Sequence, residues 1–143
     1  MLTRLLFLFC ISTLMACTPR GVITLDTDAA TVGNVERIFI GTTRNQAQDG
    51  SFGNGRSEKI RYARYDISVP PNRAPGDITW PPRHGDSDPG KHFLTVDEQV
   101  YQNDGSFRAD LKKQLAMSGG EAVIFVHGFN NNFAESIYRV AQF

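Results

Sequence analysis

The run Ala122-Val123-Ile124-Phe125-Val126, followed at once by His127-Gly128-Phe129-Asn130, decides the fold. Five apolar residues without alternation are typical of a strand that is covered on both faces by helices. The glycine and polar residues after the run predict a turn at the carboxyl end of this strand, where open α/β sheets bind their ligands. The stretch therefore predicts an α/β domain with a mostly parallel sheet flanked by helices.

A helix is expected on each side of this strand. Before it, Gly119-Gly120 can stop a helix whose apolar residues recur every four positions, namely Phe107, Leu111 and Leu115. After it, Asn132 can cap a second helix, and Glu135 lies three residues on, as in a capping box.

Three more strands are expected earlier in the chain. Residues 35–40 are rich in β-branched and aromatic side chains, and residues 92–96 form a shorter strand. Residues 59–69 alternate with a phase change near Ala63, which suggests a β-bulge. Six of the seven prolines lie in residues 70–90, so this stretch is expected to be a long extended connection, and its role stays open.

The turn after the apolar run is the candidate reactive site. Gly128 lets the backbone approach a ligand closely, and N–H groups at the end of a strand lack strand partners. Two such donors aimed at one point can hold the oxyanion of a tetrahedral intermediate. A plain tight turn at residues 127–129 is the alternative, and residues 130–132 fit capping and turn chemistry better than substrate contact.

The segment from Phe125 to Phe133 resembles a bacterial subfamily of α/β-hydrolases of unknown function, the DUF900 group. The resemblance extends over residues 35–143 through five further motifs, which are Thr43-Arg44, Arg61-Tyr62, Asp66-Ile67-Ser68-Val69-Pro70, Pro75-Gly76-Asp77-Ile78 and Trp80-Pro81. It implies the N-terminal portion of an α/β-hydrolase fold. It also implies that the backbone N–H of Phe129 is an oxyanion donor, that Gly128 gives access and that His127 shapes the loop.

The same resemblance implies a serine hydrolase of the esterase or lipase type, which acts on a small ester or acyl substrate without a cofactor. The sequence contains no G-x-S-x-G nucleophile elbow, and Ser118 ends a predicted helix instead of following a strand. We therefore expect an incomplete hydrolase domain that lacks the nucleophile. Whether the natural chain continues past Phe143 stays open, and so does the activity of this chain alone. A non-catalytic envelope lipoprotein, acting as a binding or structural module, is the alternative.

The N-terminus indicates export. Residues 1–16 combine one cation, an apolar run and a small residue before Cys17, as in a lipoprotein-type signal peptide. Leu14-Met15-Ala16-Cys17 resembles a lipobox, which implies lipid on Cys17 and a membrane partner, with the outer membrane facing the periplasm favoured. An ordinary signal peptide, giving a secreted or periplasmic protein, and a buried helix are alternatives. Residues 17–34 are expected to be a flexible tether before the domain at residues 35–143.

Charge and residue spacing argue against two other classes of partner. Fifteen Lys and Arg residues balance fifteen Asp and Glu residues, so no net field attracts nucleic acid. A possible cation-binding set in the Pro-rich region matches no standard zinc or EF-hand spacing, so no metal is expected there; its members are His84, Asp86, Asp88 and His92.

Overall fold

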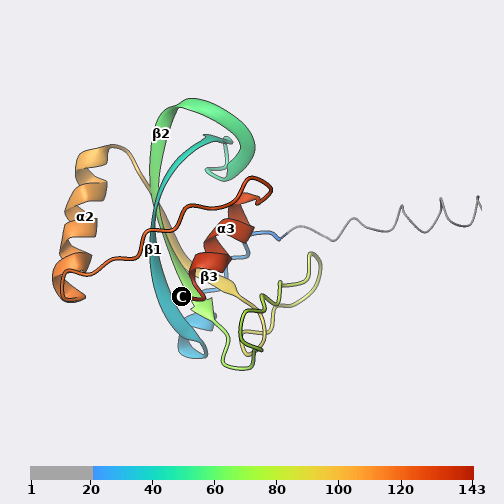
Figure 1. Ribbon diagram of the computed structural model, residues 1–143. Coiled ribbons are helices and arrows are strands. Elements are labelled where there is room, and N and C mark those ends of the chain that lie inside the picture. The colour runs from blue at the N-terminus through green and yellow to red at the C-terminus, as the bar shows by residue number, and fades with distance from the viewer. Residues whose placement is uncertain (1–20) are drawn as a thin grey trace, which may run out of the picture.

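The computed structural model describes residues 21–143, and an antiparallel sheet of three strands forms its centre (Figure 1). In the order of the sheet, the strands are β1 (Asn34–Gln46), β2 (Phe52–Val69) and β3 (Leu94–Tyr101). The helices are the short 3-10 helix η2 (Thr27–Thr31) before the sheet, and α2 (Asp104–Met117) and α3 (Phe133–Val140) after it.

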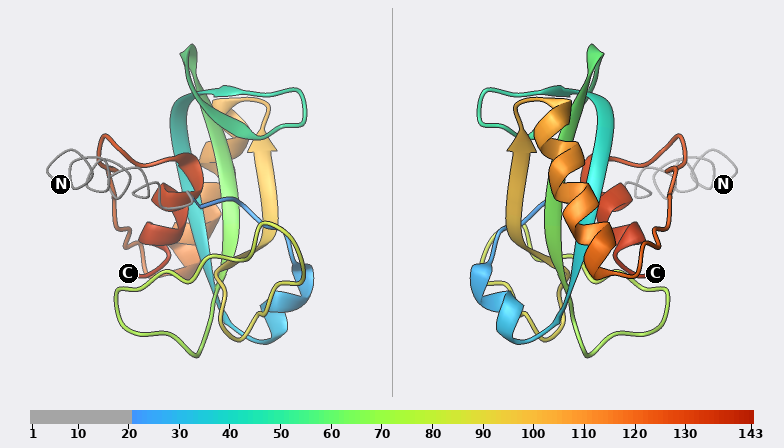
Figure 2. Two further views of the ribbon diagram at one scale, coloured as in Figure 1. Left: turned by 90° about the vertical axis from the view of Figure 1, so that its right-hand side faces the viewer. Right: turned by 90° about the vertical axis from the view of Figure 1, so that its left-hand side faces the viewer.

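The two α-helices lie on opposite faces of the sheet (Figure 2). Successive side chains of a strand point to opposite faces, so neighbouring residues of β2 contact different helices. Tyr62 stacks on Phe107 of α2 with ring centroids 4.6 Å apart. Tyr65 packs edge-on against Phe133 of α3 at 5.4 Å. The sheet is therefore the middle layer of three.

The larger core fills the space between the sheet and α3. Its buried residues include Ala63, Tyr65 and Ile67 of β2 and Phe133, Ile137 and Tyr138 of α3. By contrast, no residue of α2 is fully buried. The hydrophobic effect therefore holds α3 more firmly than α2, and α2 depends on ring contacts and polar contacts with its face of the sheet.

The expected parallel strand at residues 122–126 is not formed, and the prediction of a mostly parallel sheet is wrong for the described residues. Val123, Ile124 and Val126 are 79%, 90% and 86% exposed. The segment crosses from α2 on one side of the sheet to α3 on the other (Figure 1). An unbroken apolar run indicates burial only where other strands flank it. None of the described strands pairs with residues 122–126.

The strand and helix predictions elsewhere are largely confirmed. Both helices form, and the expected strands at residues 35–40 and 59–69 lie within longer strands. The strand expected at residues 92–96 begins two residues later, at Leu94, and extends to Tyr101. The expected strand does contain bulges, but none at Ala63 itself. Residues 57–60 of β2 lie opposite Thr43 alone, and a second register shift falls between Asp66 and Ile67. Ile60, in the first of these irregular stretches, is 57% exposed.

The connection at residues 70–90 contains no helix or strand, as its prolines predict. Residues 21–33, from the expected tether, lie against the sheet: Leu25 pairs with Thr95 in an isolated bridge, and Ala29 is fully buried. The expected signal peptide and Cys17 lie outside the described residues. No helix within residues 21–143 has the length and apolar character needed to cross a bilayer.

Candidate functional site

The loop of residues 127–132 leads into α3, and the start of that helix fixes one end of it. Asn132 is the N-cap: its side-chain oxygen accepts from the Glu135 N–H at 2.8 Å, and its own N–H donates to the Glu135 carboxylate at 2.7 Å. This is the capping box that the sequence predicts. The side-chain amide of Asn132 also donates to the Gly21 carbonyl at 2.8 Å. This bond connects the loop to the N-terminal lead-in, residues 21–25.

Arg44 of β1 holds the same loop from the other side. One guanidinium nitrogen donates to the Asn131 carbonyl at 2.7 Å. The other donates to the Gly53 carbonyl and the Asn54 side chain, each at 3.2 Å. Arg44 therefore joins the β1–β2 hairpin to the candidate loop, and this gives the Thr43-Arg44 motif a structural role that its sequence left open.

The three predicted site residues lie together at the exposed part of this loop. Phe129 is fully exposed, and a side chain added at Gly128 would meet no atom within 4 Å. His127 is exposed as well, and its Nδ1 donates to the Gly128 carbonyl at 2.9 Å. The backbone around Gly128 is thus open to an incoming ligand, and His127 contacts the loop itself.

A cavity of about 450 Å³ adjoins the loop on the α3 face of the sheet. Asn132 forms part of its wall, together with the lead-in at residues 21–25 and the turn of the β1–β2 hairpin. Sequence reasoning missed this cavity because its walls come from segments that are distant in the chain.

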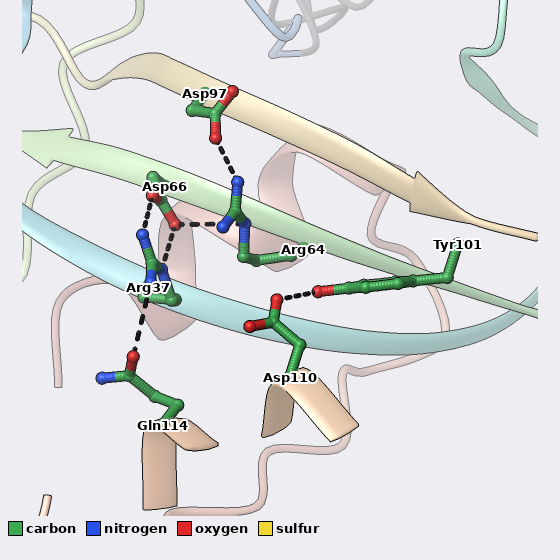
Figure 3. Close-up of polar contacts among 7 residues, drawn as sticks. All are labelled: Arg37, Arg64, Asp66, Asp97, Tyr101, Asp110 and Gln114. Atoms are coloured by element: carbon green, nitrogen blue, oxygen red, sulfur yellow. Dashed lines mark hydrogen bonds and ion pairs between the residues drawn. The ribbon is translucent and has the colours of Figure 1, made fainter. Parts of the chain in front are cut away.

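A second polar cluster lies on the opposite face, under α2 (Figure 3). Asp66 is 5% exposed and receives two hydrogen bonds from Arg37, at 2.6 and 2.9 Å. Arg64 lies 3.8 Å from the same carboxylate and also pairs with Asp97 of β3. The hydrogen bonds from Arg37 to Asp66 raise the pKa of the Arg37 guanidinium.

The same cluster reaches α2 through two contacts. Arg37 donates to Gln114 at 3.4 Å, and Tyr101 donates to Asp110. Burial, followed by the hydrogen bond to Asp110 and its charge, raises the pKa of Tyr101 to about 12. Because each carboxylate already has a cation or hydroxyl partner, we assign this cluster to docking α2 on the sheet.

The Asp88–His92 region forms a self-contained turn. The Asp88 N–H donates to His92 Nδ1 at 2.8 Å, and the Asp88 carboxylate pairs with Lys91 at 2.9 Å. Within residues 21–143, no three His, Cys, Asp or Glu residues are grouped so that they could hold a metal ion.

Comparison with known proteins adds one finding. Residues 103–143 match the family model described as alpha/beta hydrolase of unknown function (DUF900). The matched part begins at the N-cap of α2 and contains the candidate loop and α3. No curated protein and no solved structure matches the chain. The match supports the family resemblance for this C-terminal part.

Proposed function

We propose that the protein is a serine-type hydrolase that cleaves small carboxylic esters by acyl transfer to water. The observation that carries the proposal is the match to α/β-hydrolases over residues 103–143, which includes the open loop at Gly128. In this mechanism the serine attacks the ester carbonyl, the alcohol leaves, and water then hydrolyses the acyl-enzyme. The proposal places the serine outside the printed sequence.

The backbone N–H of Phe129 is proposed as one oxyanion donor. Support comes from its position three residues before the N-cap of α3, on a loop whose C-terminal end is fixed by Asn132 and by the contact of Arg44 with Asn131. A donor held in place before the reaction stabilises developing charge without reorganisation. Gly128 leaves room for the substrate, and His127 stabilises the loop through its contact with the Gly128 carbonyl.

Two variants of the natural protein test this assignment. Phe129→Pro removes the backbone N–H, whereas Phe129→Ala keeps it and removes only an exposed ring. Loss of one oxyanion donor lowers kcat by about 10²–10³-fold, so we expect that loss for Phe129→Pro with p-nitrophenyl acetate. Phe129→Ala should stay within about threefold of wild type, because no oxyanion donor is lost. Equal rates for the two variants would remove Phe129 from the mechanism.

We further propose that the protein is anchored in the bacterial envelope by lipid on Cys17, with the outer membrane as the favoured site. The support is the lipobox-like sequence at residues 14–17. A non-catalytic lipoprotein that binds a ligand is the second candidate function. The cavity beside Asn132 favours it, because binding there needs no nucleophile.

A further inference from the structure

The lead-in, residues 21–25, is bonded to both the sheet and α3. The Thr95 N–H of β3 donates to the Thr24 carbonyl at 2.9 Å, and the Asp26 N–H donates to the Thr95 carbonyl at 2.8 Å. The Thr24 N–H donates to the Tyr138 hydroxyl of α3 at 3.4 Å. Because of these bonds the lead-in is a fixed part of the domain, and it passes beside α3 (Figure 1).

Gly21, at the start of the lead-in, occupies a tight slot next to the candidate loop. It is buried, and its carbonyl accepts from the side-chain amide of Asn132 at 2.8 Å. A Cβ added at Gly21 would lie 2.2 Å from the ring of Trp80, which stacks on Tyr138 with centroids 5.3 Å apart. A larger residue would have to displace this ring. The chain therefore enters the domain at a defined place, where the loop of residues 127–132 ends.

The position of Gly21 limits how far the domain can lie from a lipid on Cys17. Even a fully extended chain covers at most about 14 Å from Cys17 to Gly21. A tether of residues 17–34, as expected from the sequence, would allow about 60 Å. A domain of this length is about 35 Å across. A lipid on Cys17 therefore keeps the side of the domain around Gly21 toward the bilayer, because the shorter reach does not let the far side turn to it.

The candidate loop on this side is suited to a bilayer interface. Phe129 lies three residues before Asn132, and its ring is fully exposed. Residues 127–132 contain no Asp, Glu, Lys or Arg, so contact with lipid removes none of these charged groups from water. Exposed aromatic side chains of this kind are typical of protein segments that lie in the interface.

We propose that the candidate loop faces the bilayer that holds the lipid on Cys17, with the Phe129 ring in the interfacial region. The short link from Cys17 to the fixed Gly21 sets this orientation, and α2, on the opposite face of the sheet, points away from the lipid (Figure 2). The inference rests on the proposed lipidation of Cys17. It needs no serine, so it is independent of the proposed catalysis.

Fluorescence quenching in vesicles tests the orientation of the natural acylated protein. Phe129→Cys and Lys113→Cys each supply one thiol for a fluorophore, and Lys113 is an exposed residue of α2, which makes it the matched control. Phosphatidylcholine vesicles carry a nitroxide on their head groups. We expect quenching of more than about half of the emission at position 129, since interfacial segments lie within about 5–10 Å of the head groups. At position 113 we expect less than about a tenth, because most of the domain's width of about 35 Å separates it from the bilayer.

A longer link then tests whether the distance from Cys17 to Gly21 sets the orientation. Insertion of fifteen Gly and Ser residues between Pro19 and Arg20 gives a link with a mean span of more than about 20 Å, so the difference between the two positions should shrink. An unchanged difference would overturn the inference.

The intact mass of the same samples separates this inference from the proposed anchor. Absence of the diacylglyceryl group would contradict the anchor, and the inference would fall with it. An acylated protein that is quenched equally at positions 129 and 113 would overturn the orientation alone and leave the anchor standing.

Discussion

At the scale of single residues, Arg44 has the clearest structural role. Its guanidinium binds Gly53 and Asn54, nine and ten residues away, and Asn131, which is 87 residues away. Sequence reasoning could single out the Thr43-Arg44 motif, but it could not supply partners that only the folded chain brings near. The residues of the candidate loop were easier to predict, because His127, Gly128 and the capping Asn132 are neighbours in sequence.

Replacing Arg44 should loosen the hairpin from the candidate loop. Arg44→Ala removes hydrogen bonds from a charged donor and leaves carbonyl oxygens without that partner, so we expect the free energy of unfolding to fall by about 2 kcal/mol. Denaturant unfolding measures this value. Arg56→Ala is the matched control, because Arg56 pairs with Arg44 across the strands and its removal relieves like-charge repulsion. A loss for Arg56→Ala as large as for Arg44→Ala would contradict this role.

At the scale of elements, local signals were enough to predict the helices, whereas the strand expected at residues 122–126 is not formed. Capping residues, apolar spacing and the glycines after α2 all act within a few positions, so α2 and α3 could be predicted. The run at residues 122–126 depends on neighbours in space. Its sequence favours a buried strand, but an apolar run does not specify which strand will pair with it.

The attachment of α2 to the sheet should weaken at high pH. Burial and Asp110 raise the pKa of Tyr101 from 10 to about 12, so the folded protein holds this proton more tightly than the unfolded chain. The resulting stabilisation is complete below pH 10 and is lost as the pH rises from 10 to 12. Tyr101→Phe should remove this part of the pH dependence of unfolding. Identical slopes for wild type and variant in that range would show that Tyr101 does not contribute.

At the scale of the whole molecule, the sheet separates two kinds of packing. One face carries the apolar core and the cavity under α3, and the other carries the Arg37–Asp66–Arg64 cluster under α2. Strand alternation predicts that Arg64 and Asp66 share a face of β2. It cannot predict their pairing with Arg37, because that depends on the register between β1 and β2.

The central claim is the proposal that this protein is a serine-type hydrolase. Chemical labelling of the reactive serine tests that proposal most directly. The natural protein, isolated from the cells that make it, is treated with a fluorophosphonate, and its intact mass and labelled peptides are determined. We predict one phosphonyl adduct, on a serine that follows a strand, and a diacylglyceryl group on Cys17. No adduct, under conditions in which a known serine hydrolase is labelled, would contradict the catalytic claim and leave the ligand-binding lipoprotein as the better account.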